Sequence, residues 1–153
     1  MKKIFVIATA LLMCCMVMGC GVKAKLDGTW KSSITREYSG EYYKDVIKTD
    51  ITLNIDKDGN FSQSFTSTTS YVPLEVGFPT MEPSKYTRKE SGTWYYHDSD
   101  KVILKTTNSS VQEGDEDPEV DNNVGYMSAE LVLVDDILFV DYGSGIYEFT
   151  KAE

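Results

Sequence analysis

Hydrophobic and polar residues alternate every second position through most of the chain after residue 25. The clearest example lies between residues 47 and 55. Apolar residues there point one way, at Ile47, Ile51, Leu53 and Ile55, and polar residues point the other way, at Lys48, Asp50, Thr52 and Asn54. A period of two indicates half-buried β-strands, and no segment of this region shows a convincing apolar stripe at helical spacing. The pattern therefore predicts an all-β domain.

The alternation divides into eight predicted strands joined mostly by short turns. The strands cover residues 28–38, 47–55, 61–68, 86–96, 102–107, 127–133, 137–142 and 147–151, and turns are expected at 56–59, 97–100, 135–136 and 143–145. An antiparallel sheet with no helix to cover it removes its edges by closing on itself. We therefore predict an eight-stranded antiparallel up-and-down β-barrel, with an eight-stranded sandwich as the alternative.

Residues 73–84 interrupt the alternation. Three prolines, Pro73, Pro79 and Pro83, exclude a central strand from this segment. The segment is nevertheless apolar at Leu74, Val76, Phe78 and Met81. This composition favours a packed Ω-loop or a lid.

The first 21 residues follow a different pattern. Lys2 and Lys3 precede an uncharged apolar run, Ile4 to Met18, which ends at Gly19-Cys20. This is the arrangement of a secretory signal peptide, and a cysteine directly after a small residue resembles the lipobox of bacterial lipoproteins. An ordinary cleaved signal and an uncleaved anchor are the alternatives. The lipobox interpretation predicts a signal peptide at 1–19, a lipidated tether at 20–25 and a domain at 26–153.

The lipobox resemblance implies an envelope protein held on a bacterial membrane by acyl chains such as palmitate on Cys20, facing the periplasm or the exterior. Cleavage removes Cys14 and Cys15, so no cysteine is left for a disulfide, for catalysis or for a metal. Cleavage also removes two lysines and no acids, which changes the net charge from −9 to −11. Such a chain is a poor partner for nucleic acid and has no polybasic patch for anionic lipids.

Several short motifs carry a family likeness. Gly28-x-Trp30 resembles the G-x-W signature of the lipocalins and the wider calycin group. The segments 26–31, 58–61, 91–94 and 147–151 are similar to those of small lipocalin-like domains in bacterial lipoproteins. The resemblance implies a barrel closed at one end by Trp30 and open at the other. It also implies that Lys151 lies over Trp30, in a cation–π contact of about 0.5–2 kcal/mol. The sequence departs from the lipocalins in lacking a helical pattern near its C-terminus.

A barrel of eight strands is either filled by side chains or holds one small ligand. Large inward positions favour a filled interior, while small and polar ones leave space toward one end, at Thr49, Gln63, Ser67, Thr69 and Gly92. The expected binding residues are Tyr38, Gln63, Phe65, Ser67, Tyr71, Phe78 and Tyr96. They predict binding of a small apolar ligand. The alternative function is a protein-interaction module with a filled barrel.

Catalytic and metal chemistry have little support in the sequence. His97 is the only histidine and lies in a predicted turn, and no nucleophile elbow or phosphate-binding loop is present. We therefore expect no enzyme, no cofactor and no metal site. Residues 56–60 fit a hairpin turn and lack the spacing of an EF-hand loop. The acidic segment 112–123 is compatible with a solvated loop and also with calcium binding.

Overall fold

The computed structural model describes residues 25–97, 101–121 and 128–153. They form β1 (Gly28–Ser39), β2 (Tyr43–Ile55), β3 (Asn60–Pro73), β4 (Ser84–Tyr96), β5 (Val102–Glu113), β6 (Glu119–Val120), β7 (Ser128–Val134), β8 (Ile137–Asp141) and β9 (Ile146–Lys151). The predicted signal peptide 1–19, the lipidation site Cys20, the tether up to residue 24 and Met127 lie outside the described residues.

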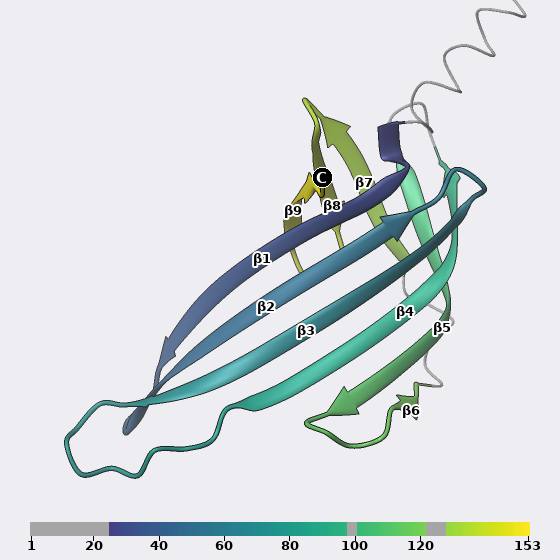
Figure 1. Ribbon diagram of the computed structural model, residues 1–153. Coiled ribbons are helices and arrows are strands. Elements are labelled where there is room, and N and C mark those ends of the chain that lie inside the picture. Colours follow the sequence, from purple (N-terminus) through teal and green to yellow (C-terminus); the bar gives the residue numbers. More distant parts are fainter. Residues whose placement is uncertain (1–24, 98–100, 122–127) are drawn as a thin grey trace, which may run out of the picture.

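Eight of these strands close into an antiparallel barrel (Figure 1). β1 to β5 pair in chain order, β5 pairs with β7, and β7 to β9 continue the series. β9 then returns to β1 through the pairs Trp30–Lys151 and Lys31–Thr150. The short β6 pairs with the end of β5 at Ser110 and Val111. The predicted up-and-down barrel is confirmed, and the sandwich alternative is wrong.

The strand register places the alternating residues on the expected faces. Ile51, Leu53 and Ile55 of β2 are buried inside the barrel, whereas Lys48 and Asn54 are exposed on its outer face. Because Cα partners in an antiparallel pair share a face, each inward residue of β2 extends its row to the neighbouring strands. The two-residue period therefore predicted correctly which side chains face the barrel interior and which face solvent.

The predicted hairpin turn after β2 is confirmed, and it depends on Asp56. Its Oδ1 accepts hydrogen bonds from the backbone N–H groups of Asp58 (2.9 Å) and Asn60 (2.8 Å), and Gly59 has a φ of 96°. The hydrogen bonds from Asn60 hold the pKa of Asp56 below its ordinary value. The carboxylate is thus bonded to its own turn, an Asx-type arrangement.

β5 is longer than the sequence predicted. It continues for six residues past Thr107, to Glu113, and β6 lies inside the segment predicted to be an acidic loop. Asn108, Ser109 and Ser110 have low or neutral β-propensity, which hid this extension. The strand forms because β4 supplies a full ladder of partners along it, with one register shift at Ser91/Gly92.

The β-bulge at Ser91/Gly92 requires a glycine. A Cβ at Gly92 would lie 2.0 Å from the carbonyl oxygen of Lys105 and 3.0 Å from the ring of Phe61. We expect Gly92→Ala to lower the free energy of unfolding by about 1–3 kcal/mol, because backbone and core must move apart. Urea unfolding followed by circular dichroism measures the effect. Thr93→Ala, on the exposed side of the same strand, is the control, and equal losses in both variants would contradict this account.

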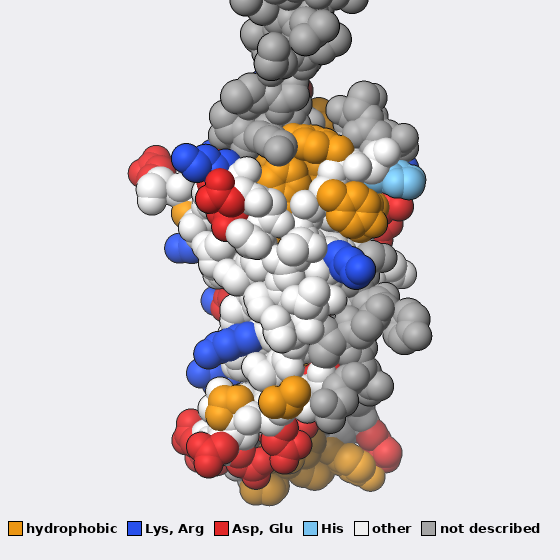
Figure 2. Space-filling view, turned by 90° about the vertical axis from the view of Figure 1, so that its right-hand side faces the viewer, with side chains coloured by type: hydrophobic (Ala, Val, Ile, Leu, Met, Phe, Trp, Pro, Cys, Tyr) orange, Lys and Arg blue, Asp and Glu red, His pale blue; other side chains and the backbone are white. Residues whose placement is uncertain are grey.

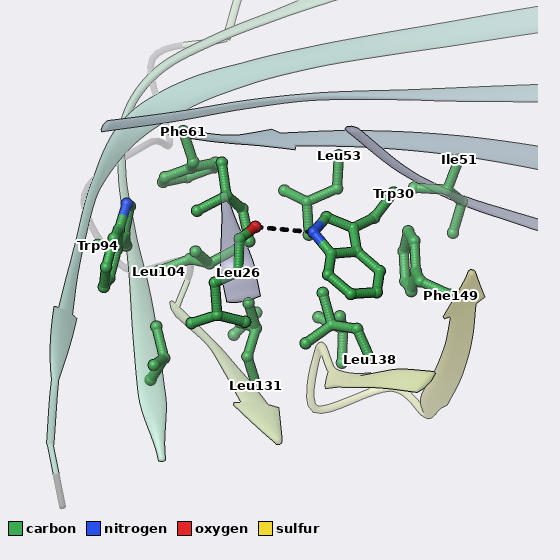
Figure 3. Packing of buried hydrophobic residues seen from close by; sticks show 14 residues of the cluster. Leu26, Trp30, Ile51, Leu53, Phe61, Trp94, Leu104, Leu131, Leu138 and Phe149 are labelled. Carbon is green, nitrogen blue, oxygen red and sulfur yellow. Dashed lines mark hydrogen bonds between the residues drawn. The ribbon is translucent and has the colours of Figure 1, made fainter. Parts of the chain in front are cut away.

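The apolar core fills the end of the barrel that contains Trp30 (Figure 3). Trp30 and Phe149 are at most 1 % exposed, and Leu26 packs beneath them from the segment before β1. The indole N–H of Trp30 donates to the carbonyl of Leu26 at 2.8 Å. Lys151 Nζ lies 5.4 Å from the centroid of the Trp30 ring, so the predicted cation–π contact is confirmed.

Strand lengths differ around the barrel, and this opens its other half. β1 to β5 have 12 to 14 residues each, whereas β7 to β9 have 5 to 7. In the described part of the chain β1 pairs with β9 only at Trp30 and Lys31. Beyond that row β1 to β5, with the short β6 beside the end of β5, form a curved half-pipe (Figure 1), which we call the open half.

Candidate functional site

A row of polar side chains crosses the barrel interior where the core meets the open half. Gln63 pairs with Glu90 across β3 and β4, and Glu90 pairs with Ser109 across β4 and β5. All three side chains are less than 9 % exposed. The same row continues through Leu53 to Trp30, so these polar groups directly adjoin the apolar core. A buried carboxylate must be hydrogen-bonded or paired to be tolerated.

Glu90 meets this requirement on both oxygens. Its Oε2 accepts a hydrogen bond from the side-chain amide of Gln63, and its Oε1 lies 2.7 Å from Nε of Arg88. The Tyr142 hydroxyl donates to Gln63 Oε1 at 2.9 Å, and Arg88 Nη2 lies 3.3 Å from Asp121 Oδ2. We call these five residues the Glu90 network. It joins β3 and β4 to the residue after β8 and to the residue after β6.

Aromatic rings pack against one side of the Glu90 network. The ring of Tyr142 meets Phe65 edge-on at 5.1 Å between centroids and Tyr147 at 5.5 Å. Burial, helped by the nearby charge of Glu90, raises the pKa of Tyr142 far above its ordinary value. Its phenol is therefore a neutral hydrogen-bond donor at physiological pH.

The raised pKa of Tyr142 predicts a late step in alkaline titration. A raised folded-state pKa gives stability that is present below the unfolded value, near pH 10, and lost as the pH rises above it. We expect one of the ten tyrosines to ionise only as the barrel unfolds, and Tyr142→Phe to remove this step. Tyrosinate absorbance and circular dichroism, recorded together, test this. Ionisation of all ten tyrosines in a folded barrel would contradict it, and Tyr95→Phe, on the surface, should retain the late step.

A hollow of about 470 Å³ lies in the open half, one row beyond Phe65 and Arg88. Its lining includes hydroxyl groups, the Tyr86 side chain and acidic residues, at Ser67, Thr69, Ser84, Tyr86, Glu113 and Asp115. Rows two residues apart on a strand are about 7 Å apart. The backbone of Arg88 is therefore about 7 Å from the row of Tyr86 that lines the hollow.

Three of the predicted binding residues lie together in the barrel interior. Gln63 belongs to the Glu90 network, Phe65 packs on Tyr142, and Ser67 lines the hollow. Ser67 Oγ also lies 3.5 Å from Oγ1 of Thr49 on β2. Of the small and polar inward residues expected to leave space, Ser67 and Thr69 line the hollow, whereas Gly92 is packed against Lys105 and Phe61.

The other four predicted residues lie elsewhere. Tyr38 and Tyr71 lie at the far end of the open half, and Tyr71 is within 3.5 Å of Ser84 through its hydroxyl. Tyr96 instead packs on Trp94, at the opposite end of β4. Twelve residues of extended strand separate Tyr96 from Ser84, or about 40 Å. Tyr96 therefore does not join Tyr38 and Tyr71 at one mouth.

The segment between β3 and β4 extends beyond the barrel (Figure 1). Phe78 packs on Tyr42 and Tyr43, and the Tyr43 hydroxyl donates to the carbonyl of Pro79 at 3.1 Å. Apolar side chains elsewhere in this segment are exposed, by 48 % at Leu74, 107 % at Val76 and 43 % at Met81. We call residues 74–83 the tip loop. The tip loop packs against neighbouring residues, as an Ω-loop does. Its other apolar side chains are exposed to solvent.

The sequence reasoning missed Arg88, Glu90, Tyr142 and Asp121. A signal for two of them was present, because Arg88 and Glu90 alternate with exposed Lys89 and share the inward face of Trp94. Charged residues at inward positions of a strand need partners. That rule would have pointed to Gln63, the one inward amide predicted on the neighbouring strand.

Within the described ranges, no group of three or more His, Cys, Asp or Glu side chains is close enough to hold a metal ion. None of the helical segments described there is long and apolar enough to cross a bilayer. The chain matches no protein-family model and no curated protein sequence.

Proposed function

We propose that this protein is a lipid-anchored binding protein of the bacterial envelope that holds a small molecule in the open half of its barrel. The observation that carries the proposal is the hollow beside the Glu90 network. Its volume of about 470 Å³ is in the range of small-molecule sites, and its lining combines hydroxyls and one aromatic side chain with the charged residues Lys85, Glu113 and Asp115. The lining suits a ligand with an apolar body and some hydrogen-bonding groups.

The interior chemistry supports this choice of ligand. Phe65 and Tyr147 are half-buried rings at the border of the packed core, which suits an apolar body. Arg88 is partly accessible and can meet an acceptor on the ligand. An apolar body with a polar group at one end uses all of these features.

Two variants on β3 test the proposal. Ser67→Phe fills the hollow, whereas Thr66→Phe places the same ring on the outer face, because successive strand residues point to opposite faces. Titration with the fluorescent probe 1-anilinonaphthalene-8-sulfonate should show saturable binding to the wild type and to Thr66→Phe. Ser67→Phe should bind at least about tenfold more weakly. Equal binding by the two variants would overturn the proposal.

The membrane anchor has its own test. We propose that Cys20 carries the lipid, on the evidence of the lipobox-like sequence alone. Cells fed an alkyne analogue of palmitate should label the wild type and Cys14→Ser, and should leave Cys20→Ser unlabelled. Labelling of Cys20→Ser, or no labelling of the wild type, would contradict a lipid at this position.

The tip loop supports a second candidate function, the binding of a protein partner. Leu74, Val76 and Met81 present apolar side chains at the end of the barrel opposite Trp30. Exposed apolar side chains that lie close together mark interaction sites. A photo-crosslinking residue at position 76 should give a discrete adduct in intact cells, and one at Lys57, in the β2–β3 turn, should not. The same adducts from both positions would contradict this function.

A further inference from the structure

A second hollow lies on the outer surface of the barrel, over β2 to β5. It has a volume of about 780 Å³, and most of its lining residues alternate with the inward rows described above. The β-bulge at Ser91/Gly92 lies at this site. Bulges bend a strand and increase its twist. The hollow is therefore a consequence of the backbone geometry that Gly92 permits.

Hydroxyl and amide groups dominate the lining of this outer hollow. Its polar uncharged members include Thr52, Asn54, Ser62, Ser64, Asn108 and Ser110. Val120 is the one apolar residue among the described lining residues. Figure 2 shows this side of the barrel, with few hydrophobic or acidic side chains over its middle and a group of acids at its lower end. Such a surface offers many hydrogen bonds and little apolar contact area.

Lysines surround these hydroxyls. Lys89 lines the hollow, and Lys31 lies on the same outer row, joined through Thr52 and Ser64. Three strand spacings separate the two lysines, or about 15 Å. Lys105, next to the bulge on β5, has the same outward direction. None of the three forms an ion pair with another residue of the described ranges.

The two carboxylates of the lining, Glu90 and Asp121, share one cation, because both contact Arg88, at 2.7 and 3.3 Å. Asp50 on the next outer row contacts Lys48 at 2.9 Å. Tyr95 adds an exposed ring to the same face of β4, four residues from Ser91. Lys31, Lys89 and Lys105 thus bring positive charge to this outer face of a chain with a net charge of −9.

We propose that this outer hollow binds an acidic polysaccharide. Sugar hydroxyls match the serine, threonine and asparagine groups, and spaced carboxylates match Lys31, Lys89 and Lys105. A protein partner would need an apolar centre with aromatic anchors, which the lining lacks. A bilayer surface or a nucleic acid would need a dense run of cations, and the net negative charge opposes both.

Binding to immobilised polygalacturonate tests the proposal, with neutral dextran as the reference. The intact protein in detergent should bind polygalacturonate and not dextran, and binding should weaken as salt screens the lysines. Lys31→Gln/Lys89→Gln should weaken binding at least about tenfold. Lys57→Gln, in the β2–β3 turn, should change it less than about twofold, because Lys57 does not lie on the outer row that joins Lys31 to Lys89.

A variant that keeps the charge separates recognition from simple ion exchange. Ser64→Leu places an apolar side chain on the floor of the hollow and should weaken polygalacturonate binding by about tenfold. Unchanged binding by Ser64→Leu would overturn the proposal. Equally tight binding to duplex DNA or to phosphatidylglycerol vesicles would also overturn it, because either result would show attraction to any polyanion.

Discussion

Replacing Trp30 by alanine is expected to lower the free energy of unfolding by about 3–5 kcal/mol, the usual cost of removing a fully buried tryptophan. Trp30 is 1 % exposed at the centre of the closed end. Its loss also leaves the carbonyl of Leu26 without its indole donor and leaves Lys151 without its ring. A domain of this size has a total stability of about 5–15 kcal/mol. The variant should therefore lose a fifth or more of it.

Urea unfolding of three variants measures this. Trp30→Phe keeps a ring but loses the hydrogen bond to Leu26, so its loss should be smaller, about 1–2 kcal/mol. Tyr95→Ala removes an exposed ring and should stay within about 0.5 kcal/mol of the wild type. If Trp30→Ala were as stable as Tyr95→Ala, the apolar core would not be centred on Trp30.

Replacing Arg88 by methionine is expected to cost about 3 kcal/mol, because Glu90 is left as a buried charge without its cation. The Glu90 side chain is 1 % exposed, and within the described residues the amide of Gln63 is then its remaining side-chain partner. Loss of a surface ion pair is a useful contrast. Lys48→Met breaks the pair with Asp50, in which both side chains are about half exposed, and should cost less than about 1 kcal/mol.

A double variant separates the contribution of the Arg88–Glu90 ion pair from that of side-chain packing. Arg88→Met/Glu90→Leu removes both charges, and we expect it to recover most of the stability lost in Arg88→Met. Urea unfolding of the two single variants and the double variant gives the coupling energy. If the two single losses simply add, Arg88 and Glu90 do not stabilise each other, and the Glu90 network contributes nothing as a unit.

The faces and order of the strands were predictable because one simple rule sets them. An alternation such as that of β2 is consistent with only one buried face. The tight turn at Asp58-Gly59 places β3 directly beside β2, so the two strands pair. The contact of Lys151 with Trp30 followed from the resemblance to lipocalins. The end of β5 was not predictable, since Asn108 to Ser110 form a strand only because β4 extends beside them. Local propensity carries no information about such a neighbour.

The positions of the residues expected to bind a ligand were predicted only in part, for a related reason. Alternation assigns Gln63, Phe65 and Ser67 to the interior, but it does not say how far along the barrel each one lies. The shear of the strands and the short β7 to β9 decide this, and they move Tyr96 to the closed end. Tyr142 follows β8, so its contact with Gln63 depends on barrel closure, which no local pattern encodes.

Native mass spectrometry of the protein taken from membranes of the producing cells tests the small-molecule proposal most directly. We predict that the wild type and Thr66→Phe carry an additional non-covalent mass of a few hundred daltons, and that Ser67→Phe has lost it. The same mass on all three proteins, or the bare lipidated polypeptide in every case, would contradict binding in the open half.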